Sequence, residues 1–299
     1  MCEVDMLSVN NQQVFINLVR AGLWEREVRL SISGEQDYSE IMRLAEEQSV
    51  VGLVTAGLEH VKDVKVPKEV LLLFIGQSLQ LERQNTLMNN FVANLIRKLR
   101  QEGVYTLLLK GQGIAQCYER PLWRSAGDVD LLLDEENYSK AKRVLTPMAR
   151  YVDKEYFNAL HLGLTVDDWI VELHGTFRSQ LWGKIDRVLD EIQADTLGKH
   201  HVRVWRNGEE DVLLPSPDND VIFVFAHILQ HYFKGGIGLR QICDWCRLLW
   251  SYRDSIDISL LEARIKEMGL VSEWNVFATL AINELCMPKE MATNRKLMP

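Results

Sequence analysis

The stretch that most restricts the fold is Arg124–Leu133, RSAGDVDLLL, which begins with polar and glycine residues and continues into a run of leucines. This pattern predicts a buried strand that the chain enters from a loop. Because successive side chains of a strand alternate between its faces, Asp128 and Asp130 are expected to share one face. Two carboxylates side by side repel each other unless a cation lies between them. The sequence therefore favours a cation site at the start of this strand. The alternative is a strand end with two solvated aspartates.

The preceding segment carries a second feature of the same kind. Residues Tyr105–Lys110 form a predicted apolar strand that ends in a lysine, and Gly111 and Gly113 follow it before a short predicted helix that runs to about Tyr118. A glycine turn between a strand and a helix start presents backbone N–H groups and the positive end of the helix dipole to an anion. The sequence thus predicts an anion site next to the cation site, with a plain turn as the alternative.

A third predicted strand, Trp169–His174, places Glu172 and His174 on one face. With a Lys-Gly turn, an Arg-x-x-Gly-Asp-x-Asp strand and a Glu-Leu-His strand in this order, the chain resembles the uncharacterised nucleotidyltransferase family. That family belongs to the nucleotidyltransferase superfamily of DNA polymerase beta. The resemblance covers Leu107–His174 well and Val221–Asp244 more loosely.

The resemblance implies a fold and a reaction. The expected fold class is α/β (α+β), a small mixed sheet that carries the site between helical N-terminal and C-terminal segments. The implied reaction moves a nucleoside monophosphate from an NTP to a hydroxyl-type acceptor on a small molecule or protein and releases pyrophosphate. Two divalent ions, Mg²⁺ or Mn²⁺, about 3.5 to 4 Å apart would hold the attacking and leaving oxygens.

The resemblance also assigns roles to the acidic residues. Asp128 and Asp130 correspond to the metal-binding pair. Glu172 corresponds to the third carboxylate, which would complete the metal site or accept the proton of the acceptor hydroxyl. The competing acids Asp167 and Asp168 precede the apolar strand, where a turn is expected.

Gly111 and Gly113 would allow a triphosphate to approach the backbone closely. The turn differs from the family pattern, since it is Gly111-Gln112 rather than Gly-Ser or Gly-Gly, and its separation from the Asp-x-Asp is longer. This departure leaves a second interpretation open, a non-catalytic nucleotide-binding or partner-binding protein that keeps the fold. The three carboxylates favour the enzyme, because a protein that only binds has little need of mutually repelling acids.

Several cations and one further acid are candidates for the nucleotide site. Lys110 and Arg124 would balance phosphate charge. Alternatively, Lys110 is a strand end and Arg124 an ion-pair partner of Asp128. Arg240 and Asp244 form an i,i+4 pair that is either a surface bridge or turned toward the nucleotide.

Four histidines are candidates for the lining of the cleft. His161 and His174 are on predicted strands and are either structural or catalytic. His227 and His231 share a helix face, but the residue after the first is Ile228, which excludes the metalloprotease signature. We expect the second pair to pack against the central region and line the cleft.

Two other motifs are set aside. Cys243-Asp244-Trp245-Cys246 lies in the middle of a predicted helix, whereas a redox motif starts a helix after a strand. Lys234-Gly235-Gly236-Ile237-Gly238 lacks a preceding strand and the dinucleotide spacing, so it is predicted to be a loop between helices.

The apolar periodicity divides the chain into three regions. Residues 1–102 are expected to be helical, residues 103–215 to alternate between strands and helices, and residues 216–299 to be helical again. The resemblance implies that 103–215 is the nucleotidyltransferase catalytic core and that 216–299 covers the cleft. Helices are predicted at 11–23, 38–47, 51–60, 67–99, 136–149, 184–193, 218–232, 239–252, 259–268 and 271–286. Strands are also predicted near 156–166, 201–205 and 211–214.

Charge and cysteine content restrict the compartment and the partners. A formal net charge of −8 disfavours a nucleic-acid partner, because phosphate-backbone binding requires a basic surface. Five scattered cysteines fit free thiols in a reducing compartment. The first residues lack a signal-peptide pattern, and the apolar runs are too short for a membrane span. We therefore expect a cytoplasmic protein without a membrane partner.

Overall fold

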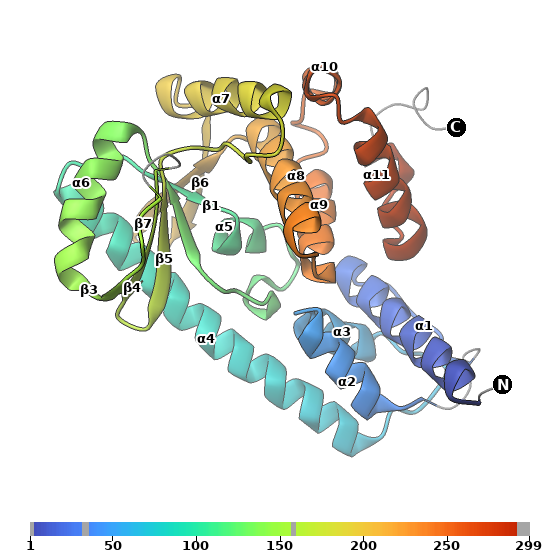
Figure 1. Cartoon of the computed structure of the whole chain (residues 1–299). Helices are drawn as coiled ribbons and strands as arrows, with labels where there is room; N and C mark the ends of the chain where they lie inside the picture. The colour runs from blue at the N-terminus through green and yellow to red at the C-terminus, as the bar shows by residue number, and fades with distance from the viewer. Residues whose placement is uncertain (1–2, 32–35, 157–159, 292–299) are drawn as a thin grey trace.

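The computed structural model describes residues 3–31, 36–156 and 160–291. Its N-terminal part contains α1 (Glu3–Trp24), α2 (Tyr38–Glu47), α3 (Val51–Glu59) and α4 (Lys68–Gln101). α4 begins directly after Pro67, whose fixed φ suits the start of a helix. It continues without a break, and Figure 1 shows it running from the N-terminal helices to the sheet. The predicted N-terminal helices are therefore confirmed.

Among the described residues, the central strands form one mixed sheet in the order β1-β2-β5-β4-β3. Its strands are β1 (Leu107–Leu109), β2 (Val129–Leu132), β3 (Ala149–Val152), β4 (His161–Val166) and β5 (Trp169–His174). β2 and β5 are parallel, whereas β1 pairs antiparallel with β2, and β4 pairs antiparallel with both β5 and β3. The parallel pair places Asp130 opposite Glu172, and the β4–β5 pair places His161 opposite His174.

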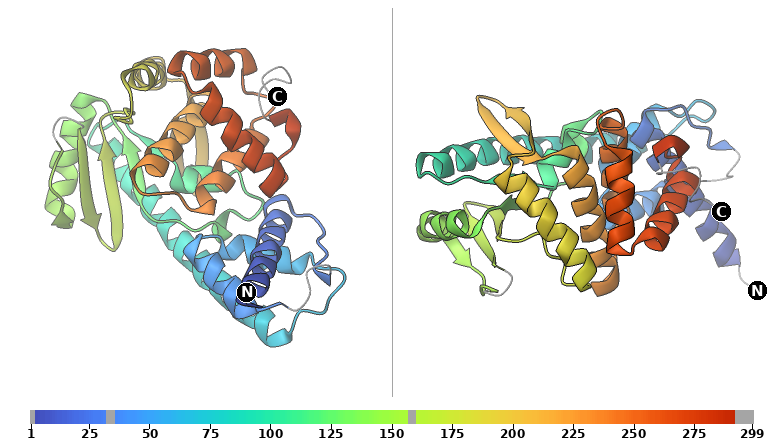
Figure 2. Two further views of the ribbon diagram at one scale, coloured as in Figure 1. Left: turned by 45° about the vertical axis from the view of Figure 1, so that its right-hand side comes forward. Right: turned by 90° about the horizontal axis from the view of Figure 1, so that it is seen from above.

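The other elements lie beside this sheet or, toward the C-terminus, farther from it (Figures 1 and 2). They are α5 (Gly111–Ala115), η2 (Pro121–Trp123), α6 (Glu135–Leu145), η3 (Thr146–Met148), α7 (Gly183–Gly198), β6 (Val202–Asn207), β7 (Glu210–Pro215), α8 (Pro217–Lys234), α9 (Leu239–Ser251), α10 (Ile258–Met268), α11 (Val271–Leu285) and η5 (Lys289–Met291). β6 and β7 form a separate antiparallel hairpin. None of the helices in the described ranges combines the length and the apolar composition that a membrane span requires.

Two hydrophobic cores lie on opposite faces of the sheet. One core, called the sheet core here, joins the C-terminal half of α4 and α6 to one face of the strands. Its members include Met88, Val92, Leu99, Leu108, Val129, Leu131, Leu133, Tyr138, Ala141, Leu162, Leu164, Val171 and Leu173. The other, called the helical core, includes Val14, Leu53, Phe74, Leu107, Leu132, Ile185, Phe225, Trp245 and Trp274.

The alternation along β2 decides where its polar residue points. Val129 and Leu131 belong to the sheet core and Leu132 to the helical core. Asp130 therefore faces the side of the helical core. The helical core contains residues from all three regions proposed from the sequence. The division at residues 102 and 215 therefore stays a prediction.

One predicted helix ends earlier than expected. Instead of reaching Ala149, α6 ends at Leu145, and η3 and the edge strand β3 follow it. Pro147 explains the difference, because proline lacks the N–H that would continue the helix and its ring clashes with the preceding turn. β3 was missed because its side chains are largely exposed and show no apolar alternation.

Other boundaries also differ, and α7 ends at Gly198 instead of residue 193. The strand predicted near 156–166 begins at His161, and residues 157–159 lie outside the described residues. α5 ends at Ala115 rather than near Tyr118.

Candidate active site

Three carboxylates from neighbouring strands meet on the side of the sheet that faces the helical core. Asp128 directly precedes β2, Asp130 lies within it, and Glu172 is on β5. One oxygen of each carboxylate lies within 4.8 Å of the other two. An all-oxygen donor set of this kind suits a hard divalent cation such as Mg²⁺ or Mn²⁺. The residues present therefore fit the ions that the family resemblance implies.

Asp130 is 1% exposed and lies between two cationic or proton-donating groups. Its Oδ1 lies 3.2 Å from Lys110 Nζ and 2.8 Å from His174 Nε2. Burial alone would raise the pKa of Asp130, but Lys110 and His174 outweigh it and lower this pKa to about 2. At Asp128 the balance is reversed, because burial and the charge of Asp130 raise its pKa. Asp128 is therefore the carboxylate with most to gain from a bound cation.

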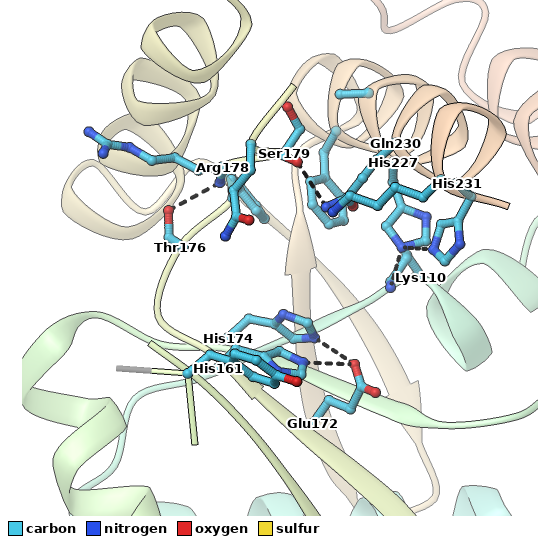
Figure 3. Close-up of a pocket in the computed structure, with 16 residues that line it drawn as sticks. Lys110, His161, Glu172, His174, Thr176, Arg178, Ser179, His227, Gln230 and His231 are labelled. Atoms are coloured by element: carbon cyan, nitrogen blue, oxygen red, sulfur yellow. Dashed lines mark hydrogen bonds and ion pairs between the residues drawn. The ribbon is translucent and has the colours of Figure 1, made fainter. Parts of the chain in front are cut away.

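Glu172 is held by two imidazoles. Its Oε2 lies 3.3 Å from Nε2 of His161 and 3.3 Å from Nε2 of His174, and Figure 3 shows both rings directed at this carboxylate. These two contacts lower the pKa of Glu172 despite its partial burial. Burial opposes protonation of His174, but the contacts with Asp130 and Glu172 prevail and raise its pKa.

The turn after β1 has an unusual backbone. Lys110 and Gly111 both have positive φ, at 48° and 43°. A Cβ on Gly111 would lie 3.4 Å from the carbonyl oxygen of Asp128, whereas one on Gly113 would lie 2.6 Å from the Leu214 side chain. Gly111 thus fits the turn beside the carboxylates, and Gly113 allows α5 to pack against β7. Gln112, at the position of the departure from the family pattern, is buried and donates to Asn85 Oδ1 at 3.0 Å.

Arg124 and Asp244 form a buried pair that joins the loop before β2 to α9. Arg124 donates from Nε and Nη2 to the two oxygens of Asp244 at 2.8 and 2.7 Å, and Tyr118 Oη donates to Oδ1 at 2.7 Å. Arg124 Nη1 also donates to the Ser125 carbonyl. Arg124 thus pairs with Asp244 and not with Asp128, the partner considered from the sequence. Asp244 therefore does not form the i,i+4 pair with Arg240 that the sequence suggested.

Arg240, unlike Arg124, has no carboxylate partner among the described residues. Its Nη1 donates to the Ser125 carbonyl at 2.8 Å, and its buried Nε has no hydrogen-bond partner. Within the described residues, no carboxylate lies within 4.0 Å of its guanidinium group, although Asp128 and Asp130 line the same cavity. Burial and the nearby Arg124 lower the pKa of Arg240.

His227 and His231 lie on α8 beside Lys110. Their Nε2 atoms are 3.0 Å apart, and Lys110 Nζ is 3.0 Å from His227 Nε2. Burial, followed by the charge of Lys110, lowers the pKa of both imidazoles, and strongly so for His227. This pair is therefore uncharged near neutral pH and extends the polar wall of the site.

Two cavities meet at these residues. The smaller, about 210 Å³, is lined by the carboxylates together with Lys110, Gly111 and both Arg124 and Arg240. The larger, about 680 Å³, is lined by all four candidate histidines (Figure 3). Lys110, Glu172, His227 and His231 belong to both linings, so the two cavities share one wall.

Part of the lining of the larger cavity was not predicted from the sequence. Its lining includes the segment after β5, Thr176 to Gln180, and Gln230 and Lys234 of α8. The available signal was the polar stretch that directly follows the Glu-Leu-His strand, since loops at strand ends commonly carry binding residues.

The Cys-x-x-Cys motif and the glycine-rich segment lie where the sequence predicted them, inside a helix and in a loop between helices. Cys243 and Cys246 are free, buried within α9, and burial raises the pKa of both thiols. Gly235 to Gly238 connects α8 to α9. The other described cysteines, Cys117 and Cys286, are also free, and Cys2 lies outside the described residues.

Most of the chain matches a known protein family. Residues 34–285 match the model of a family described as "Uncharacterised nucleotidyltransferase". The chain belongs to this family. No curated protein and no solved structure matches it. The family match confirms the predicted resemblance, and the mixed sheet surrounded by helices is a nucleotidyltransferase-type α/β fold.

Proposed function

We propose that this nucleotidyltransferase-family protein is a metal-dependent enzyme that transfers a nucleoside monophosphate from an NTP to a hydroxyl-type acceptor. The observation that carries the proposal is the convergence of Asp128, Asp130 and Glu172 at two adjacent parallel strands, with one carboxylate oxygen of each within 4.8 Å of the other two. Family membership supports an NTP as the donor. Mutually repelling carboxylates without a matching number of cationic partners are costly unless a cation is bound.

The three carboxylates would hold the divalent ions, which supply positive charge at the transferring phosphate and orient its oxygens. Lys110 and Arg240 are the cations best placed for the remaining phosphate charge. Arg240 supports this assignment by its unpaired Nε and its place in the lining of the smaller cavity. Arg124, whose donors are occupied by Asp244 and Ser125, instead fixes the loop that presents Asp128.

The larger cavity is proposed as the acceptor side of the site. It borders Glu172, the carboxylate expected to act on the acceptor hydroxyl. Its volume of about 680 Å³ suits a small molecule or a protein segment. The net charge of −8 argues against a polynucleotide acceptor. Because α8 and α9 supply His227, His231 and Arg240 to these linings, we also propose residues 216–299 as the cover of the cleft.

The experiment that tests this proposal is calorimetric titration with each NTP in the presence of Mg²⁺ or Mn²⁺, followed by an assay of pyrophosphate release. The variant Asp128→Asn/Asp130→Asn should lose divalent-dependent NTP binding while its circular dichroism spectrum stays unchanged. The matched control is Asp167→Asn/Asp168→Asn in the β4–β5 turn, which should bind like the wild type.

Two outcomes contradict the proposal in different ways. If Mg²⁺-dependent NTP binding survives in Asp128→Asn/Asp130→Asn, the nucleotide site lies elsewhere. If wild type binds NTP but releases no pyrophosphate with any metal or acceptor pool, the protein is a nucleotide binder that has kept the fold.

A further inference from the structure

We propose that His161, Glu172 and His174 form a second cation site, which binds a borderline transition-metal ion of the Zn²⁺ class on the acceptor side of the cleft. This inference rests on the proposed function for its role, although its existence is testable without turnover. It adds a nitrogen-containing site to the all-oxygen site of Asp128, Asp130 and Glu172.

The strand geometry brings the three side chains together. His161 is the first residue of β4 and His174 the last of β5, and they are directly opposite in the antiparallel register. Glu172 lies two residues before His174 and so points to the same face. The ring centroids of the two imidazoles are 4.9 Å apart and their planes are tilted by 57°. The three side chains thus converge from two neighbouring strands.

The distances match those around a small tetrahedral ion. Both Nε2 atoms lie 3.3 Å from Glu172 Oε2, and one donor atom of each residue lies within 4.8 Å of the other two. Zn²⁺ bonds of about 2.0 to 2.1 Å in a tetrahedron place neighbouring donor atoms about 3.3 to 3.4 Å apart. Two donor separations of the proposed site therefore already have the required value.

The donor chemistry separates this site from the first. Two imidazoles and one carboxylate suit Zn²⁺ and similar ions, whereas Mg²⁺ prefers oxygen donors. Three protein ligands with an open position are the arrangement of catalytic rather than structural zinc sites. All three residues line the larger cavity, so a fourth ligand of a bound ion would come from that side (Figure 3).

Charge balance also favours a cation here. Glu172 belongs to both candidate sites, and Lys110 is the nearest fixed cation, 3.2 Å from Asp130. Arg240 lines the same cavity as the carboxylates, so three carboxylates face two cations, Lys110 and Arg240, which still leaves a surplus of negative charge. His174 Nε2, now 2.8 Å from Asp130, would leave that contact on binding an ion and release the Asp130 carboxylate to the first site. The two sites are thereby coupled through Asp130 and Glu172.

The test uses the full chain, freed of any affinity tag and stripped with a chelator. Zn²⁺ binding is measured by calorimetry, and Co²⁺ is used as a spectroscopic probe, because its visible absorption is stronger in four-coordinate than in six-coordinate sites. Wild type should bind Zn²⁺ in the presence of millimolar Mg²⁺ and give the four-coordinate Co²⁺ spectrum. His161→Gln and His174→Gln should each weaken Zn²⁺ binding by at least tenfold, on the order of 1.4 kcal/mol.

Two variants make the result specific. His231→Gln replaces one imidazole of the other nearby histidine pair, His227 and His231, and should leave Zn²⁺ binding unchanged. Asp128→Asn should keep the Co²⁺ spectrum while losing Mg²⁺-dependent NTP binding, since Asp128 belongs to the first site only. Thermal denaturation of each variant checks that it remains folded.

The outcomes separate this inference from the proposed function. Absence of Zn²⁺ binding by wild type, or a loss in His231→Gln but not in His161→Gln, overturns the second site, whatever the result with NTP. Zn²⁺ binding that depends on His161 and His174 upholds the site even if no NTP binds.

Discussion

The two faces of the central sheet are built from the same strands and yet have opposite chemistry. On one face, Leu131 and Val171 are fully buried in the sheet core. On the other, their chain neighbours Asp130 and Glu172 line the cleft with His174. Because side chains alternate along a strand, a residue that stabilises the core and a residue that lines the cleft are direct chain neighbours. Mutations one position apart on β2 should therefore fail in different ways.

The largest expected effect is on the apolar face. Leu131→Asp would bury a carboxylate without a partner, which should cost more than about 4 kcal/mol of unfolding free energy and leave the protein largely unfolded. The control Leu131→Met keeps volume and polarity and should cost less than about 1.5 kcal/mol. Urea denaturation followed by circular dichroism measures both. A folded Leu131→Asp protein would contradict the assignment of this face.

The second prediction compares two arginines beside the cleft. Arg124→Ala leaves Asp244 buried without its charge partner and should cost about 3 to 5 kcal/mol of unfolding free energy. Arg240→Ala should change stability by less than about 1 kcal/mol, because it removes one hydrogen bond to the Ser125 carbonyl. It should nevertheless weaken NTP binding severalfold. Denaturation and calorimetry on the same samples measure the stability and the NTP affinity of both variants. A large loss of stability in Arg240→Ala with unchanged NTP affinity would make Arg240 a structural residue.

The smallest expected effect is a pH dependence of the metal-free protein. The pKa of Asp130 is lowered in the folded state to about 2 from an ordinary value of 3.8. The stability that its ionised form contributes is therefore present above about pH 4 and is lost as the pH falls toward about 2. Asp130→Asn should show a shallower loss of thermal stability over this window than wild type. Equal slopes for the two proteins in chelator would contradict the ion-pair role of Asp130.

The apolar face was readable from the sequence, and the polar face only in part. The leucines after Asp130 and the valine before it marked a buried strand, and the order of Asp-x-Asp and Glu-Leu-His motifs brought the three carboxylates to one place. What the sequence did not contain was the pairing between distant segments. The bond of Arg124 to Asp244, and the contact of Lys110 with His227, join residues more than a hundred positions apart.

Residues that look equivalent in the local sequence also have different neighbours in the structure. Gly111 and Gly113 are two residues apart in one turn, but one lies beside Asp128 and the other against Leu214. Arg240 and Asp244 have ideal helical spacing for an ion pair, yet Asp244 binds an arginine from another segment. A local rule gives the available partners, and tertiary packing selects among them.

The central claim is that the polar face of the sheet performs chemistry, and Glu172 tests it most directly. The measurement is a parallel determination of NTP affinity and of the rate of NTP conversion to NMP and pyrophosphate with Mn²⁺, for wild type and Glu172→Gln. Glu172→Gln keeps size and loses charge, so NTP affinity should stay within a few-fold, roughly under 1 kcal/mol. Turnover should fall by about two orders of magnitude or more, because a group that acts mainly in the transition state affects rate more than binding. Equal rates in the two proteins would contradict the catalytic assignment of this face.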